Sequence, residues 1–429
     1  MHMYCEQAEA INWRHLFAES RGILLTAALL MAVAWPAWAD GFEYPGVRQA
    51  SQILPKHMLA GPHFKVREKV VTYGYLHHWT VDSDFGVFEV TGDGALRQLI
   101  KEIHAIAALR KISNSDAFVR SLAESAKAPI NLAKGLIQHP VDTISGIPKG
   151  IFQIFANIGE AITMEHDPSE DSGIKQLLFV SSWKRDFAHD YGINVYSSNK
   201  VLQKELNRVG WYAAIAGLSV SAVGAAASAT AILVLKDMRL ANQLNNVLKE
   251  EPPSRLRIIN EKKLAEMGVP EALSKKYLDN PHFTPRHDTI IVGSLYDMKG
   301  ARGQGAFLKY VMSASDEVAA NFFQDMAEMM RGYHEHVSPI TDITPVGGFV
   351  VVKAANGSYM IPFPLDYGAW TSQAHRYFRY MRANYRDPGF NDRFDVWVRG
   401  TVTPLTRRKV TEMGNTITER VDRRINFMD

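Results

Sequence analysis

Fifteen histidines supply this chain with imidazoles for acid–base or metal chemistry. Two pairs are close in sequence, His282 with His287 and His334 with His336. The second pair lies at a predicted helix end, where residues i and i+2 point about 200° apart, so one ion is not easily shared. Imidazoles near a helix C-terminus also interact favourably with the helix dipole. We therefore interpret these histidines as structural, with a zinc site formed by both pairs as the alternative.

A second candidate for chemistry is the segment DFAHDYG, in which Asp186, His189 and Asp190 fall within one helical turn. A paired carboxylate and imidazole could serve as a general base with the group that orients it. The chain has no G-x-S-x-G nucleophile elbow, and its only cysteine is Cys5. The sequence keeps a hydrolase as an alternative function but assigns no nucleophile to it.

Three other segments carry weaker signals. His77 and His78 are neighbours on one strand predicted over residues 70–81, so their side chains face opposite ways and are not expected to share a metal. The turn VTGDGAL could hold a phosphate at a helix N-terminus, but Asp93 places a negative charge there. The glycines of GARGQG are not followed by a Walker lysine. The sequence therefore indicates no catalytic, cofactor-binding or metal-ligating residue, and no cofactor.

Arginine and aromatic residues alternate in HRYFRYMRANYR. Arg376, Arg379, Arg382 and Arg386 recur at spacings of three and four, which places cations along one side of a predicted helix. Such a stripe could bind anionic lipid headgroups or an acidic partner. A solvated helix face that covers aromatic core residues is the alternative. Arg376 and Arg379 are the candidate contacts.

The N-terminus has the pattern of a secretory signal peptide. Arg14 and Arg21 precede an uncharged run over residues 22–35, and Ala37 and Ala39 occupy the small-residue positions of a cleavage site. The apolar run is shorter than the ~20 residues of a membrane span. After cleavage the chain contains no cysteine, which excludes disulfides and thiolate chemistry in it. We expect an exported protein of the periplasm or cell envelope.

From residue 118 the chain aligns with itself at a step of eleven, so that Pro129 matches Pro140 and Gly135 matches Gly146. Eleven residues make three helical turns, and proline is tolerated at the first helical position. The pattern predicts short amphipathic helices with one apolar face. Candidate contacts with a membrane surface or a partner protein on this face are Ile151, Phe152, Phe155 and Ile158.

No charged residue lies between Arg208 and Lys236. The length of this stretch suits a membrane span, but its many Ala, Gly, Ser and Thr residues gain little from lipid. A membrane span and a buried helical hairpin are the two interpretations of residues 209–235. Small residues at i+4 steps let helices approach closely, and the candidate contacts are Gly217, Ser221 and Ala225.

Together these segments predict an α+β fold that is mainly helical. Charged residues make up 22% and apolar residues 46% of the chain, with a net charge of +3 and no long basic tract, so nucleic-acid binding is not indicated. The expected parts are a signal peptide (1–39), an N-terminal β-hairpin and helix (40–112), Pro/Gly-punctuated amphipathic helices (113–164), a linker and loop (165–200), an apolar Ala/Gly-rich helix or helical hairpin (201–252), a helical domain (253–340) and a small C-terminal α+β unit (341–429).

The segments FGVFEV, HPVDTISG, DYGINVYSSNKVLQKELNRVGW, FTPRHDTIIVGSLYDMKG and VRGTVTPLTRRKVTEMG resemble a family of secreted proteobacterial proteins of unknown function. The stretch Tyr191–Leu206 is the most specific part. The resemblance implies export and a shared architecture, and supplies no activity, cofactor or catalytic residue. The sequence favours an exported, non-enzymatic envelope protein that associates with a membrane surface or a protein partner. A periplasmic hydrolase with an Asp/His or His–metal site and a soluble helical binder of a hydrophobic ligand are the alternatives.

Overall fold

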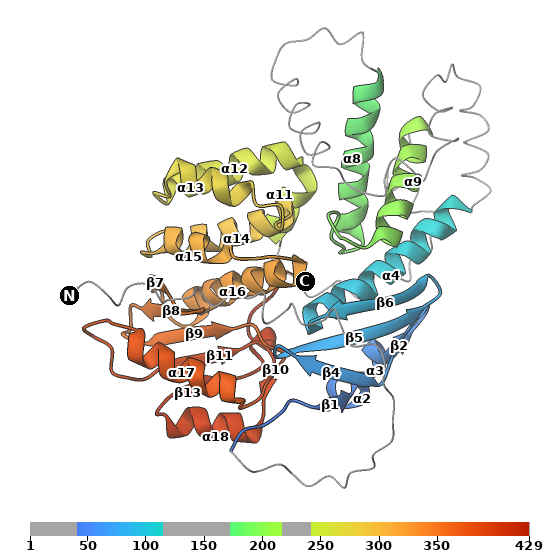
Figure 1. The fold of residues 1–429 in the computed structure, drawn as a ribbon. Helices are drawn as coiled ribbons and strands as arrows, with labels where there is room; N and C mark the ends of the chain where they lie inside the picture. The colour runs from blue at the N-terminus through green and yellow to red at the C-terminus, as the bar shows by residue number, and fades with distance from the viewer. Residues whose placement is uncertain (1–40, 115–171, 217–241, 429) are drawn as a thin grey trace.

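The computed structural model describes residues 41–114, 172–216 and 242–428 (Figure 1). The signal peptide, the eleven-residue repeat and most of the uncharged stretch lie outside these ranges. So do the following candidate contacts: Ile151, Phe152, Phe155, Ile158, Gly217, Ser221 and Ala225. None of the helices in the described ranges has both the length and the apolar character needed to cross a bilayer.

The expectation of a mainly helical fold is wrong. About 51% of the confidently placed residues are helical and 19% are in strands, which form three sheets. The error arises at the N-terminus, where one β-hairpin was expected and a six-stranded sheet is found. Several of its strands have only two or three residues, too few to show a period of two in the sequence.

This N-terminal sheet is antiparallel, in the order β1-β4-β5-β3-β2, with β6 paired to the other edge of β5. Its strands are β1 (Val47–Gln49), β2 (Ala60–Gly61), β3 (Phe64–Val66), β4 (Lys69–Tyr73), β5 (Leu76–Ser83) and β6 (Gly86–Thr91), with short helices α2 (Ala50–Ile53) and α3 (Lys56–Leu59) between β1 and β2. Helix α4 (Asp93–Ser113) covers one face, where Leu96 and Leu99 join a core with Trp79.

Helices α8 (Ser172–Asp190) and α9 (Lys200–Ala216) pack against the far half of α4, as the green and cyan ribbons of Figure 1 show. Their core contains Trp183 and Phe187 from α8, Leu206 from α9 and Leu109 from α4. The N-terminal part of the molecule is therefore a sheet and a helical layer joined through α4.

The C-terminal part is built on a five-stranded mixed sheet in the order β13-β11-β9-β8-β7. Its strands are β7 (Ile340–Val346), β8 (Phe349–Ala354), β9 (Tyr359–Phe363), β11 (Asp395–Val398) and β13 (Thr416–Thr418). Strands β8 and β9 form a hairpin, and Gly357 in the turn between them has a positive φ of 81°. A short parallel pair, β10 (Tyr367–Gly368) with β12 (Thr401–Val402), lies at the end facing the N-terminal sheet.

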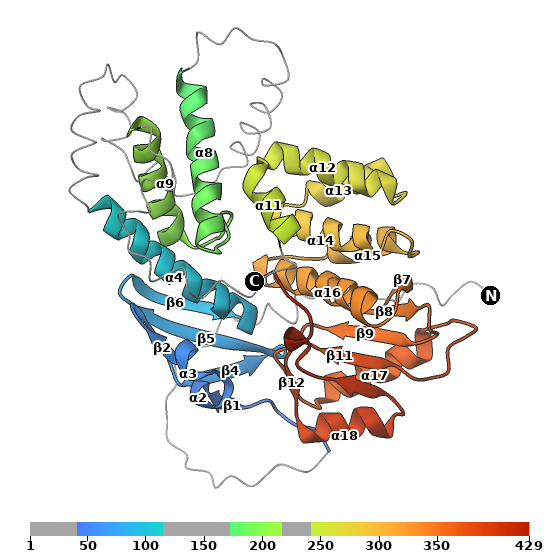
Figure 2. The same ribbon diagram turned by 180° about the vertical axis from the view of Figure 1, so that it is seen from behind.

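Helices cover both faces of this sheet (Figures 1 and 2). One face carries layers formed by α11 (Asn242–Glu250), α12 (Pro253–Glu266), α13 (Glu271–Leu278), α14 (Pro285–Asp297), α15 (Gln304–Val311) and α16 (Glu317–His336). The other carries α17 (Ser372–Asn384) and α18 (Pro404–Glu412). Alternation along β8 fits this arrangement, because Val350 and Val352 join the core of α16 while Val351 joins that of α17.

Candidate functional site

The single strand expected over residues 70–81 is two strands joined by a tight turn. Gly74 and Tyr75 both have positive φ, 58° and 67°, and Tyr73 pairs with Leu76 across them. Two-residue turns with positive φ at both positions match the twist of a β-hairpin. A tyrosine in this left-handed region is uncommon and costs conformational energy, so surrounding contacts must hold it.

Those contacts come from the C-terminal part of the molecule. The Tyr75 hydroxyl is 2.6 Å from the Thr371 hydroxyl, and the Tyr75 carbonyl accepts hydrogen bonds from the backbone N–H groups of Asp366 and Tyr367, both at 3.1 Å. Figure 1 shows the end of β4 and the start of β5 beside β10. The hairpin tip is thus the point where the two sheets meet, which we call the junction.

Three ionisable residues converge at the junction, namely His77, Asp93 and Asp366, which we call the junction cluster; His77 and Asp366 are buried and Asp93 is half-buried. His77 Nδ1 is 2.8 Å from Asp93 Oδ1 and 3.9 Å from Asp366 Oδ2. Side-chain exposure is 1% for His77 and 5% for Asp366. In the described ranges, this is the one group of three or more His, Cys, Asp or Glu side chains whose ligand atoms all lie within 4.8 Å.

Each member of the junction cluster is placed by a different element. His77 is the second residue of β5, Asp93 is the first residue of α4, and Asp366 follows β9. The Asp366 carboxylate accepts the backbone N–H of His77 at 2.8 Å and that of Asp93 at 3.2 Å. It therefore acts as a cap for α4, whose preceding residue Gly92 has no side chain to do so.

A close backbone approach fixes Asp366. A Cβ atom at Gly400 would stand 2.1 Å from the Asp366 carbonyl oxygen, so only glycine fits there. The same carbonyl accepts the N–H of Thr401 at 3.0 Å. The Asp366 segment is thereby held against β12 while its carboxylate reaches across to the N-terminal sheet.

The electrostatics of the cluster are asymmetric. Burial, with a further contribution from the negative charge of Asp93, raises the pKa of Asp366 to about 7. Burial alone would also raise the pKa of Asp93, but the hydrogen bond and charge of His77, with help from Arg97 and Trp79, bring it below its usual value. The pKa of the Asp366 carboxyl group is therefore raised and that of the Asp93 carboxyl group is lowered, although both groups lie beside His77.

A cation lies on the other side of the imidazole. Arg48 Nη1 is 3.5 Å from His77 Nε2, and its guanidinium lies 4.2 Å from the centre of the Tyr367 ring. Tyr367 in turn stacks on His77, with ring centres 6.2 Å apart and an angle of 22° between the planes. The imidazole is thus enclosed by a carboxylate on one edge, a guanidinium on the other and an aromatic face.

A cavity of about 90 Å³ adjoins the hairpin tip, which we call the junction cavity. Its wall combines the tip of the β4–β5 hairpin, the C-terminal sheet, α17 and α18, with two residues of α16. The lining residues are Gly74, Tyr75, Leu76, Phe322, Met326, Gly347, Gly348, Phe349, Pro362, Phe363, Leu365, Gly368, Ala369, Ala374, Tyr377, Phe378, Val396, Val398, Val402, Thr406, Val410 and Ile417.

The wall of the junction cavity is apolar. No described residue that lines it is charged, and only Tyr75, Tyr377 and Thr406 have polar side-chain atoms. Each of these three hydroxyls already has a hydrogen-bond partner, at 2.6, 2.6 and 3.1 Å respectively. The cavity therefore offers carbon surface rather than unsatisfied donors, a chemistry that suits apolar ligands.

Of the candidate site residues, Arg376 and Arg379 are described, and both are exposed on α17. The cationic stripe is interrupted, because Arg382 turns inward to the Met413 carbonyl at 2.9 Å and to Asp392 at 3.2 Å. Helix α17 thus separates an apolar cavity wall from an exposed pair of guanidinium groups.

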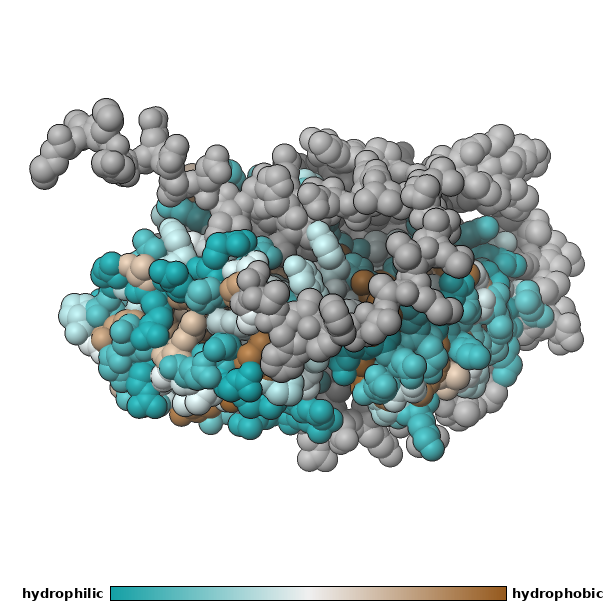
Figure 3. All heavy atoms as spheres, turned by 60° about the horizontal axis from the view of Figure 1, so that its bottom comes forward, coloured by the Kyte–Doolittle hydropathy of each residue, from teal (hydrophilic) through white to brown (hydrophobic). Residues whose placement is uncertain are grey.

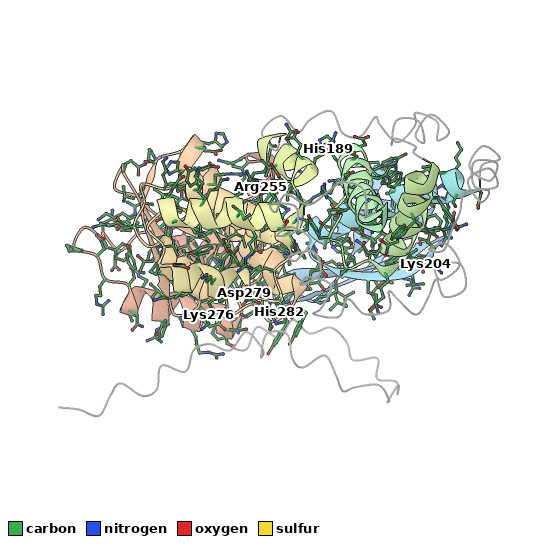
Figure 4. All side chains as sticks on the ribbon, turned by 90° about the horizontal axis from the view of Figure 1, so that it is seen from above. His189, Lys204, Arg255, Lys276, Asp279 and His282 are labelled. Atoms are coloured by element: carbon green, nitrogen blue, oxygen red, sulfur yellow. The ribbon has the colours of Figure 1, made fainter. Side chains whose placement is uncertain are left out.

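The other sequence candidates for chemistry are not brought together. His189 contacts its neighbour Asp190 at 3.4 Å on the surface rather than Asp186. Figure 4 places His189 on α8 and His282 in the loop after α13, on separate parts of the molecule. His334 Nδ1 accepts the backbone N–H of Ile340 at 2.9 Å.

His287 closes the N-terminus of α14. Its backbone N–H donates to the Thr284 hydroxyl and its Nδ1 accepts the Thr284 N–H at 3.2 Å, which completes a capping box. Its Nε2 is 2.9 Å from the Asn321 amide oxygen. Burial is the main cause that lowers its pKa to about 4. His287 is thus a buried neutral imidazole with a structural role.

From the sequence, His77 and Asp93 were considered separately and neither of them was assigned to a site. Asp366, which connects them, is 273 residues from Asp93 and carries no local motif. Comparison with known protein families, curated proteins and solved structures finds no match for this chain, so its resemblance to secreted proteobacterial proteins stays a prediction.

Proposed function

We propose that the protein is an exported binding protein that holds an apolar ligand, or the apolar part of an amphiphile, in the junction cavity. The observation that carries this proposal is the apolar wall, whose few hydroxyls are already hydrogen-bonded. A ligand that covers this surface gains roughly 25 cal/mol for each Å² of apolar area removed from water.

The size of the cavity supports the same function. A site for one water needs about 10–15 Å³ on this measure, so a cavity of about 90 Å³ has room for several ligand atoms. Apolar cavities of this kind stay dry and take up apolar molecules such as small aromatic rings. A short acyl segment or a single aromatic ring is the ligand class that fits.

Ligand binding is testable with the mature, tag-free protein. Calorimetric titration with benzene, a probe with a single aromatic ring, should give saturable binding, and organic extraction of freshly purified protein should release an apolar compound. Ala374→Leu places a larger side chain in the cavity wall and should abolish probe binding. Ala383→Leu lies on the exposed side of the same helix and serves as the matched control. Equal probe binding by both variants would place the probe elsewhere and reject the proposal.

Export follows from the signal-peptide pattern and has its own test. N-terminal sequencing of the protein from a periplasmic fraction should begin at Asp40. If the full-length chain is recovered only from the cytoplasm, export is refuted, but the proposal of ligand binding is unaffected.

A second candidate function is association with an anionic membrane surface. Arg376 and Arg379 are exposed, and residues 341–428 carry thirteen Lys or Arg against eight Asp or Glu. Figure 3 shows a largely hydrophilic lower face with scattered apolar residues, which favours electrostatic attachment over insertion.

Vesicle sedimentation tests the membrane candidate. The protein should co-sediment with phosphatidylglycerol vesicles at low salt, less so at high salt, and not with phosphatidylcholine alone. Arg376→Glu with Arg379→Glu should abolish this, whereas Lys204→Glu with Lys276→Glu makes the same charge change on α9 and α13 (Figure 4) and should lower it little. An equal loss in both double variants would indicate a general charge effect and no docking face.

A further inference from the structure

The junction cluster contains more than a helix cap requires. Asp366 alone satisfies the backbone N–H groups of His77 and Asp93. The structure nevertheless adds a second carboxylate and an imidazole, with ligand atoms all within 4.8 Å of one another. Burying ionisable groups together is costly unless their charges are balanced.

A fourth donor beside the cluster has no partner. The Thr72 hydroxyl is buried, with the residue 7% exposed, and makes no hydrogen bond within the described structure. Thr72 lies directly opposite His77 in the β4–β5 pair, so both side chains leave the same face of the sheet. Buried hydroxyls are almost always hydrogen-bonded, so the partner of this one, on the same face as His77, is expected to be a bound ion or water.

We propose that the junction cluster binds one divalent cation of the Zn²⁺ or Mn²⁺ type. Its ligands are His77 Nδ1, one oxygen of Asp93 and one oxygen of Asp366, with the Thr72 hydroxyl as a further oxygen donor. Imidazole together with carboxylates is a donor set that these cations accept, and a positive ion offsets the two neighbouring carboxylates.

The donor spacing agrees with this assignment. Ligand atoms around a tetrahedral ion with bonds of about 2.0–2.1 Å stand roughly 3.4 Å apart. The distances from His77 Nδ1 to Asp93 Oδ1 and to Asp366 Oδ2, 2.8 and 3.9 Å, lie on either side of that value. Adjustments of about half an ångström would bring these two distances to that value, and the ligand oxygens of the two carboxylates lie within 4.8 Å of each other.

The surroundings orient these ligands. Trp79 Nε1 donates to Asp93 Oδ1 at 3.1 Å, and the two backbone N–H groups hold the Asp366 carboxylate. Such outer contacts commonly fix ligating carboxylates. Ligation at Nδ1 places the imidazole proton on Nε2, so Arg48, 3.5 Å from that atom, must move aside. Asp93 is 22% exposed and provides the route from solvent.

The ion would join the two halves of the molecule. His77, Asp93 and Thr72 belong to the N-terminal sheet and α4, whereas Asp366 belongs to the C-terminal part. Metal binding should therefore raise the unfolding temperature of the whole protein, not of one half.

Isothermal titration of chelator-treated, tag-free mature protein with ZnCl₂ and with MnCl₂ tests the proposal. At least one of the two should bind with one equivalent per chain. His77→Gln and Asp366→Asn should each weaken that binding by about tenfold or more, and Thr72→Val by less. His78→Gln is the matched control, because His78 lies on the opposite face with its Nδ1 3.2 Å from Thr91.

Each outcome of the titration either supports or overturns the proposed metal site. No binding of either cation, or binding that His77→Gln leaves unchanged, would overturn the site. If a cluster variant fails to fold, anomalous scattering from wild-type crystals soaked in the same cation replaces it. A peak between His77, Asp93 and Asp366 would support the site, and a peak only elsewhere would reject it.

Discussion

A variant that fills the junction cavity tests whether this space is empty and whether it is the binding site for apolar molecules. Leucine at position 374 adds three carbons to the wall formed by α17. An empty cavity costs about 24 cal/mol per Å³, so a cavity of about 90 Å³ corresponds to about 2 kcal/mol of lost stability. Imperfect fit of the larger side chain opposes the gain by about 1 kcal/mol. We expect Ala374→Leu to raise the free energy of unfolding by about 1 kcal/mol.

The assay is urea unfolding of the mature protein, followed by tryptophan fluorescence, with and without the apolar probe. Wild-type protein should gain about 2.7 kcal/mol when the free probe is at 100 times its dissociation constant. Ala374→Leu should gain nothing from the probe because its cavity is filled. The exposed control Ala383→Leu should stay within about 0.5 kcal/mol of wild type and retain the gain.

Two results would refute this reasoning. If Ala374→Leu is destabilised and the probe still stabilises it, the cavity is neither empty nor the binding site. If the control changes as much as the cavity variant, the effect comes from the helix and not from the cavity.

Three further predictions concern other parts of the structure. Gly400→Ala places a methyl group against the Asp366 carbonyl, so it should lower the free energy of unfolding in urea by about 1–3 kcal/mol. Proteolysis between the two halves should also become faster. Unchanged stability would contradict the close approach of the two backbones. Because burial lowers the pKa of His287 to about 4 from an ordinary 6.5, the unfolded chain binds more protons between these values. The stability due to neutral His287 is complete above pH 6.5, and about 3 kcal/mol of it is lost as the pH falls to 4. The free energy of unfolding of wild type minus that of His287→Gln should therefore rise between pH 4 and pH 6.5. A difference that does not change with pH would exclude a buried neutral imidazole. Tyr75→Phe removes the hydroxyl contact of the hairpin tip and should cost about 1 kcal/mol in thermal unfolding, whereas Tyr73→Phe on the exposed face should cost less than about 0.5 kcal/mol; equal costs would mean that the hydroxyl contact contributes nothing.

Local signals predicted the elements that have strong periodicity or clear caps. The helix expected in the unit over residues 40–112 is α4, and in the expected helical domain Thr284 caps α14 and Pro285 is its first residue. Helix α16 is buried between α14 and the sheet and hides residues around most of its circumference. Periodicity identifies the helix but not how many neighbours cover it.

What escaped prediction depends on contacts between distant residues. The Gly74–Tyr75 turn interrupts an alternation that looks continuous, since nothing in the sequence marks tyrosine as a residue with positive φ. The junction cluster needs Asp366 to reach residues 273 and 289 positions earlier, and no spacing rule covers such distances. From the sequence, His77 and Asp93 were considered but neither of them was assigned to a metal site, and no signal marked Asp366, so the junction cluster is apparent only in three dimensions.

The long reach of the hairpin tip has a consequence for how the protein matures. Tyr75 contacts Thr371, which is 296 residues later in the chain, so a chain emerging from its N-terminus forms the first sheet long before its partner exists. Contacts of such high sequence separation form late, after the costly closure of the intervening loop. Until Asp366 arrives, the start of α4 lacks its cap and Tyr75 lacks the bonds that hold its turn. The cavity and the cluster can therefore be completed only after the C-terminal sheet has reached the hairpin tip, and any ligand or ion bound there would stabilise only chains in which both parts have folded.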